Sequence, residues 1–190
     1  MARRKVLFIG NSFTARNDVP GLVAQLAEAA GHHLDSQLIS AGGASLRRHW
    51  NTGTATRAIE LGDFDRVVLQ EQSTLPIKNT GRMHENVRLF DAAIKAAGAK
   101  TVLYMTWARR HAQQSQQAIT DAYTTIAVDL GADVIPAASL GSACWSSPSA
   151  PSYTTATAAT PRLPAATWPH AAPSPCCLAT TRSACPRRHS

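Results

Sequence analysis

No cysteine precedes Cys144 in this 190-residue chain, and all four cysteines lie in its last third. Their spacing matches no zinc or redox motif, so we expect no metal site. Long apolar runs are absent as well. The run Val6–Ile9 after the basic N-terminus is too short for a secretion signal, and no stretch approaches the ~20 residues of a membrane span. These absences predict a cytoplasmic protein that does not associate with membranes.

Acidic residues are absent after Asp133. Residues 1–136 contain 15 Lys and Arg and all 12 Asp and Glu, so their formal charge is +3, whereas residues 137–190 contain four Arg and carry +4. An excess of three positive charges on the part with a folded pattern is typical of a solvated surface. We therefore expect no nucleic-acid partner.

The last 54 residues, 137–190, differ in composition from the rest. They lack Val, Ile, Phe, Met, Asp, Glu, Asn, Gln and Lys, and they hold eight of the eleven prolines. Such a composition buries too little apolar surface to offset the entropy of ordering the chain. The sequence predicts a compact domain over 1–136, followed by a low-complexity tail over 137–190 that is disordered or frameshifted.

Short apolar runs alternate with amphipathic stretches over residues 5–135. Such alternation favours an α/β fold, a three-layer α/β/α sandwich around a parallel five-stranded sheet. We expect helices ending before Gly31, Gly98 and Gly131. The expected strands are Lys5–Ile9, Gln37–Ser40, Arg66–Gln70, Thr101–Thr106 and Asp133–Ile135.

Small and polar residues follow the first three expected strands. Gly10-Asn11-Ser12 follows the first, and a serine at a strand-to-helix turn lies at the sheet edge where α/β folds bind ligands. Taken alone, Ser12 can equally be a turn or helix-capping residue. Gly42-Gly43 follows the second strand and Gln70-Glu71-Gln72-Ser73 the third, so all three loops are expected at the same edge.

This constellation over residues 5–135 resembles the SGNH (GDSL-like) hydrolase superfamily. The resemblance implies an acyl or acetyl esterase without cofactor or metal, acting on a small-molecule ester. Ser12 would be the nucleophile, and the oxyanion hole would be formed by the backbone N–H groups of Ser12 and Gly43 and the side-chain amide of Gln72. Asn11 stands where the superfamily usually has Asp, and Gln72 stands where it has Asn.

The superfamily takes its general base from a late Asp-x-x-His motif, and this chain has none. His32, His33, His49, His84 and His111 all precede the expected position, and we interpret them as surface or loop residues. The sequence thus predicts an impaired esterase. The alternative is a non-catalytic ligand-binding module with an interaction tail. The ester substrate and the oligomeric state are not specified by these patterns.

A shifted reading frame accounts for the missing motif. In the shifted frame, each new codon combines the last base of one present codon with the first two bases of the next. The new codon across Ala156 and Thr157 can encode Asp, and the one across Ala159 and Thr160 can encode His. The two codons between them can encode Gly and Ser. The shift also explains the missing Asp, Glu, Asn, Gln and Lys, because all five need adenine in the middle codon position. We infer a one-base loss or two-base gain near Pro136.

Restoring the frame after Pro136 should therefore raise solubility, melting temperature and ester hydrolysis together. The restored histidine would supply the base, and the C-terminal helix that follows this motif in the superfamily would cover apolar sheet surface. The measurement compares the present chain, the repaired chain and the repaired chain carrying Ser12→Ala on a panel of acyl esters. Unchanged stability and hydrolysis after repair would contradict the frameshift and favour the binding module.

Overall fold

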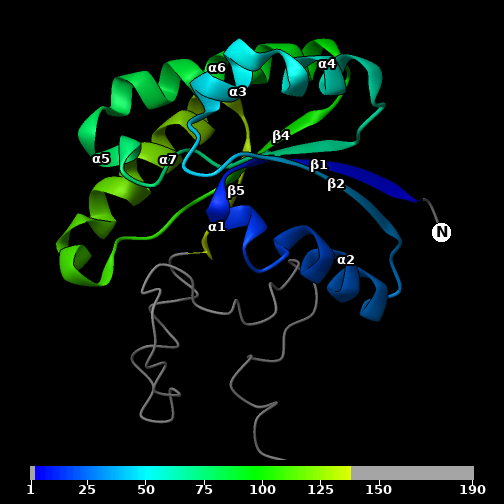
Figure 1. The fold of residues 1–190 in the computed structure, drawn as a ribbon, viewed down its shortest axis with the longest axis horizontal. Helices are drawn as coiled ribbons and strands as arrows, with labels where there is room; N and C mark the ends of the chain where they lie inside the picture. Colours follow the sequence, from blue (N-terminus) through cyan, green and yellow to red (C-terminus); the bar gives the residue numbers. More distant parts are fainter. Residues whose placement is uncertain (1–2, 138–190) are drawn as a thin grey trace, which may run out of the picture.

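Five parallel strands form one sheet in the order β2-β1-β3-β4-β5 in the computed structural model, which describes residues 3–137 (Figure 1). This confirms the expected α/β fold with its five-stranded parallel sheet. The expected boundary between 136 and 137 adjoins the end of this range, and the tail 138–190 lies outside it. The strands are β1 Arg4–Gly10, β2 Leu34–Ser40, β3 Arg66–Leu69, β4 Lys100–Tyr104 and β5 Asp133–Ile135.

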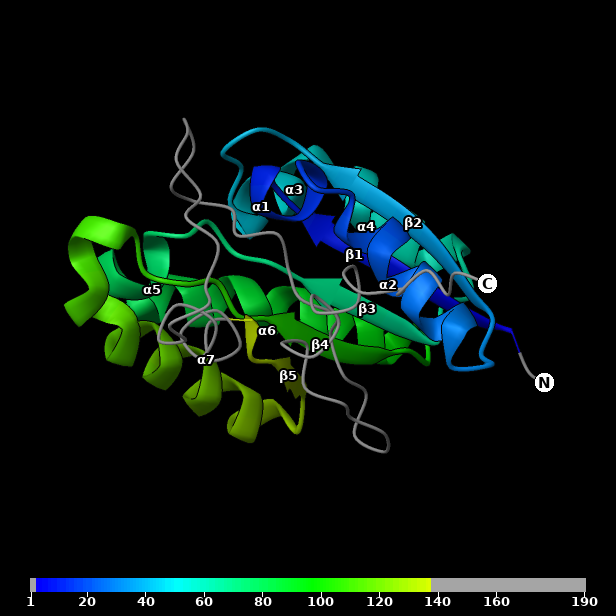
Figure 2. The ribbon, with the colours of Figure 1, turned by 90° about the horizontal axis from the view of Figure 1, so that it is seen from below.

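Helices lie on both faces of the sheet, as Figures 1 and 2 show. One face carries α3, α4, α6 and α7, and the other carries α2 with the short α1 beside it. The described helices are α1 Ser12–Ala15, α2 Val19–Ala29, α3 Leu46–Thr52, α4 Thr54–Leu61, α5 Leu75–Lys78, α6 Thr80–Ala96, the 3₁₀ helix η1 Arg110–Ser115 and α7 Gln116–Leu130. Among the described residues, no helix is both long and apolar enough to cross a membrane.

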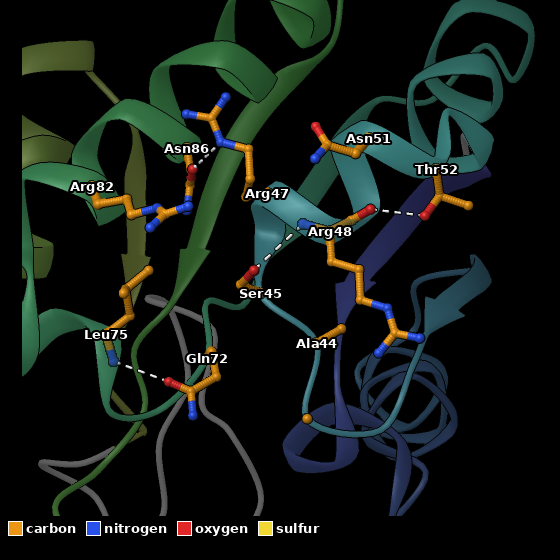
Figure 3. A pocket seen from close by; sticks show the side chains of 11 residues that line it. Ala44, Ser45, Arg47, Arg48, Asn51, Thr52, Gln72, Leu75, Arg82 and Asn86 are labelled. Carbon is orange, nitrogen blue, oxygen red and sulfur yellow. Dashed lines mark hydrogen bonds between the residues drawn. The ribbon is translucent and has the colours of Figure 1, made fainter.

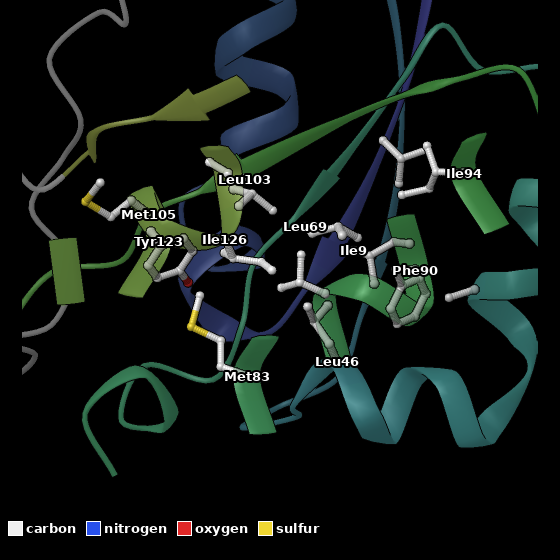
Figure 4. Close-up of a cluster of buried hydrophobic side chains, with 14 of the residues drawn as sticks. Ile9, Leu46, Leu69, Met83, Phe90, Ile94, Leu103, Met105, Tyr123 and Ile126 are labelled. Carbon is white, nitrogen blue, oxygen red and sulfur yellow. The ribbon is translucent and has the colours of Figure 1, made fainter. Parts of the chain in front are cut away.

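The interior strand β1 is buried on both faces, so its side chains divide between two cores. Leu7 and Ile9 pack with Phe90 of α6 and Ile126 of α7 in the larger cluster (Figure 4). Val6 and Phe8 point the other way and join Val68 and Val102 in the smaller one. This placement explains why β1 reads as a continuous apolar run, since alternating residues face two apolar layers.

The helix ends agree with the glycine positions, but the short helices α3, α4 and α5 are not anticipated by the sequence patterns. Gly31, Gly98 and Gly131 all adopt left-handed φ values between 62° and 78° at or just after helix ends, which confirms their expected role. The short helices α3 and α4 have few buried residues and are separated by Gly53 at φ 76°. Their apolar pattern is too brief to indicate a helix.

Strand register brings the ends of three strands to one level. Gly10 at the end of β1 pairs with Ser40 at the end of β2, and Ile9 pairs with Leu69 at the end of β3. The loops after these strands therefore leave the sheet side by side, which positions the candidate site.

Candidate active site

Ser12 is the first residue of α1, directly after the turn that leaves β1. It is half-buried, and neither its hydroxyl nor its N–H donates a hydrogen bond to any residue of 3–137. The sequence predicts this position at the carboxyl edge of the sheet. Its role as nucleophile stays a prediction.

The side chain of Asn11 connects the serine turn to the glycine loop. Its Oδ1 accepts from the N–H of Phe13 at 3.1 Å, and its Nδ2 donates to the carbonyl of Ala44 at 2.9 Å. The residue is only 2% exposed, so both polar atoms are satisfied inside the protein. An aspartate could make the first bond but not the second, because a carboxylate has no N–H. This geometry gives a reason for Asn at this position.

Gln70, buried directly after the end of β3, fixes the same turn from the other side. Its Oε1 accepts from the N–H of Asn11 at 2.9 Å and from the hydroxyl of Thr14 at 3.0 Å. These contacts require glycine at position 10, since a Cβ there would lie 2.6 Å from Thr14 Oγ1 and 2.7 Å from Gln70 Oε1. The sequence patterns place Gln70 where the third strand meets its loop, but they do not predict these contacts.

Glu71 joins the loop after β3 to the start of α3. One carboxylate oxygen accepts from the N–H of Leu46 at 3.0 Å and of Gln72 at 2.7 Å, and the other accepts from Asn86 Nδ2 at 2.9 Å. Burial raises the pKa of this carboxyl, while these bonds and the charge of Arg47 oppose the rise. Two charged or polar residues in succession after a buried strand are the sequence signal that could have indicated such a network.

Gln72 holds its amide in one orientation. Its Oε1 accepts from the N–H and the hydroxyl of Thr74, both at 2.9 Å, and from the N–H of Leu75 at 3.1 Å. Because backbone N–H groups can only donate, the oxygen must lie on that side. The Nε2 group therefore points away from this turn, and it donates to none of the described residues (Figure 3).

Gly43 lies on the opposite side of the same opening. Its φ of 64° is left-handed, which glycine adopts at no steric cost. Its N–H also donates no hydrogen bond within residues 3–137. The structure thus brings Gly43 and Gln72 to one groove, whereas Ser12 is not among the residues that line it. Ser12 is related to both loops through its neighbour Asn11, which bonds to Ala44 and Gln70.

That groove has a volume of about 690 Å³ and runs from Gly43 and Gln72 between α3 and α6. Most of its lining residues are polar, and three of them are arginines from two helices (Figure 3). The lining residues are Gly43, Ala44, Ser45, Arg47, Arg48, Asn51, Thr52, Gln72, Leu75, Arg82 and Asn86.

His49 is not a surface residue, contrary to the sequence interpretation. It lies buried on α3, and its Nε2 is 2.8 Å from the carbonyl of Gly10, to which the ring N–H donates. Burial lowers the pKa of His49, and the charge of Arg48 lowers it further, against the opposing effect of the Gly10 bond. The apolar pattern around Leu46 and Trp50 is too short to predict that His49 faces inward.

No histidine of residues 3–137 hydrogen-bonds to Ser12. His84 is half-buried against the carbonyl of Ala122, while His32, His33 and His111 are exposed. The expected position of the Asp-x-x-His motif lies outside the described residues. No group of three or more potential metal ligands occurs within the described part of the chain.

Replacing Asn11 by Asp should lower the free energy of unfolding by about 1–3 kcal/mol, the cost of leaving a buried polar group unsatisfied. The carboxylate would face the Ala44 carbonyl without a proton to share. Asn79→Asp is the matched control, because Asn79 is exposed and uses only its oxygen, on the N–H of Arg82. Urea unfolding of both variants checks this, and equal losses would contradict the bridging role.

Stability should also depend on His49 as pH falls. Its folded pKa is lower than the unfolded value near 6.5, so the neutral form is favoured by folding. This contribution is fully present above about pH 6.5 and is lost as pH falls toward the folded pKa. Melting temperatures from pH 8 to pH 5 should therefore decline more steeply for the present chain than for His49→Gln. Parallel curves would contradict the prediction.

Comparison with known proteins gives solved structures with the same fold. No family model matches the chain, and no curated protein matches it in sequence. A protein from Slackia heliotrinireducens assigned to the SGNH hydrolases is 27% identical, with a TM-score of 0.67 over 75% of this chain and 83% of that one.

More distant likenesses are found to two proteins with named activities. A lipase/acylhydrolase from Enterococcus faecalis is 17% identical, with a TM-score of 0.58 over 77% of this chain and 81% of the other. A variant of an acetyl-xylooligosaccharide esterase from Geobacillus is 13% identical, with a TM-score of 0.55 over 74% and 79%. The sheet order, the three loops at its edge and the Slackia likeness place this chain in the SGNH hydrolase superfamily.

Proposed function

We propose that this chain is a serine ester hydrolase of the acyl or acetyl esterase type, with Ser12 as nucleophile. The observation that supports it best is the set of buried bonds connecting the three loops. Asn11 bonds to both Ala44 and Gln70, and Glu71 bonds to both Leu46 and Gln72. Such a set fixes the loops relative to one another, which preorganised catalysis requires.

The reaction would begin with attack of the Ser12 hydroxyl on the ester carbonyl. The hydroxyl oxygen forms a bond to the carbonyl carbon, its proton passes to a base, and the carbonyl oxygen becomes negative. The N–H groups of Ser12 and Gly43 and the Nε2 of Gln72 are the proposed donors to that oxygen. All three donate to nothing among the described residues, so they are available for it. Collapse then expels the alcohol, and water releases the acyl group.

The proposed enzyme is impaired in its present form, because its sequence lacks the Asp-x-x-His base. Oxyanion stabilisation and binding alone retain roughly 10³–10⁴-fold over water when triad residues are removed from a serine protease. A comparably slow but measurable hydrolysis is therefore expected here.

Hydrolysis of p-nitrophenyl acetate should test the assignment. The present chain should turn over slowly, and Gln72→Leu, which removes the amide at similar size, should reduce the rate by about 10²-fold if that donor acts as in other oxyanion holes. Ser12→Ala should abolish acyl-enzyme formation, measured by mass spectrometry. Ser36→Ala on β2 is the matched control.

Two outcomes would contradict parts of this proposal. If Ser12→Ala and Gln72→Leu both leave the rate unchanged, the reaction does not occur at this edge of the sheet. A rate equal to that of an intact serine esterase, lost in Ser12→Ala, would instead refute the impairment and indicate another base. His111 and His170, a histidine within the 137–190 tail, would then be replaced first.

A further inference from the structure

We propose that the groove beside Gly43 and Gln72 selects esters whose alcohol part carries an anionic group, a carboxylate or a phosphate. The inference rests on the proposed function, because it places the ester carbonyl at Gly43 and Gln72. The remainder of the substrate would then lie along the groove, over the side chains of Arg48 and Arg82.

The groove carries an excess of positive charge. Arg47, Arg48 and Arg82 all line the groove, and no Asp or Glu is among its lining residues. Arg48 extends from α3 on one side and Arg82 from α6 on the other, as Figure 3 shows. Two helices thus direct cationic side chains to the opening that the proposed oxyanion donors Gly43 and Gln72 also line.

Within the part of the chain that the structure describes, the guanidinium groups of Arg48 and Arg82 are also free to bind a ligand. Many arginines on the described surface pair with an acid, such as Arg4 with Asp65 at 2.8 Å and Arg88 with Asp129 at 2.7 Å. Neither Arg48 nor Arg82 makes an ion pair or a side-chain hydrogen bond within residues 3–137. Both therefore keep all guanidinium donors available to a carboxylate or phosphate.

Arg47 has a different role from these two. Its Nε donates to Asn86 Oδ1 at 2.9 Å, and its guanidinium lies 3.7 Å from Glu85. Asn86 in turn donates to Glu71, whose other oxygen fixes Gln72. Arg47 therefore offsets the buried Glu71 charge, and the positive potential for a ligand comes from Arg48 and Arg82.

The rest of the lining offers hydroxyl and amide groups from Ser45, Asn51 and Thr52, and Leu75 is the one large aliphatic side chain among the lining residues. A small polar alcohol with an anionic substituent satisfies both the hydrogen-bonding groups and the charge.

The test compares three acetate esters: 4-acetoxybenzoate, 4-acetoxyphenyl phosphate and the neutral methyl 4-acetoxybenzoate. For each anionic ester, kcat/KM is divided by kcat/KM of the neutral ester. These ratios are then compared between the parent and its variants, so that differences in the chemical reactivity of the esters cancel. In the double variant Arg48→Gln/Arg82→Gln, at least one of these ratios should fall about tenfold, because each exposed ion pair contributes a few-fold. The two arms show whether carboxylate or phosphate is preferred.

The matched control is Arg57→Gln, which removes the same charge from an exposed position on α4 outside the groove. It should leave both ratios within twofold of the parent. The preference of the parent for anions should also weaken as salt rises from 20 to 500 mM, because exposed charges are screened. Ratios that are equal in the double variant and the parent would overturn the proposal.

A binding arm separates this proposal from the esterase assignment. The amide analogues 4-acetamidobenzoate and methyl 4-acetamidobenzoate resist hydrolysis, and their dissociation constants can be measured by NMR titration of the full chain. One outcome is that the parent binds the anionic amide selectively, the double variant does not, and no hydrolysis depends on Ser12. This outcome would refute the esterase assignment but support the anion-binding groove. If hydrolysis is lost in Ser12→Ala but neither assay shows a preference for anions, the esterase assignment stands and the proposed anion selectivity of the groove is refuted.

Discussion

The Asn11 side chain spans the gap between the turn after β1 and the loop after β2, and the candidate site depends on this bridge. Its two polar atoms bond to Phe13 and Ala44, and its own N–H bonds to Gln70. Buried polar groups are costly unless they are paired, so a network in which every member is satisfied permits one loop arrangement and penalises others. The position of Ser12 follows from that arrangement, because Ser12 is the next residue along the chain.

A second buried group, Glu71, gives the site its electrostatic character. Burial alone would favour the protonated carboxyl, but three N–H donors and the nearby Arg47 stabilise the charged form. The positive charge of Arg47 therefore stabilises the Glu71 carboxylate. Because Glu71 is compensated by Arg47 and the N–H donors, its charge does not cancel those of Arg48 and Arg82. The groove is therefore cationic beside the proposed oxyanion donors.

Sequence patterns predict the sheet and the three edge loops well, since strands such as β1 are buried on both faces and glycine marks the helix ends. They do not predict α3 and α4, whose few buried residues produce no clear period. The contacts of Gln70, Glu71 and His49 are also missed, because each joins residues from 15 to 59 positions apart. A local pattern cannot specify which distant loop a buried polar group will bond.

The parallel sheet also limits where a catalytic base could enter. β5 pairs with β4 through Tyr104 and Ile135, so the chain after β5 leaves the same edge as Ser12. β1 and β5 are separated by β3 and β4, which corresponds to about 14 Å at the usual strand spacing. About five extended residues span that distance. The shifted frame would place its Asp-x-x-His motif about 20 residues beyond β5. The intervening length is therefore sufficient for a histidine to reach Ser12 with no change in the described fold.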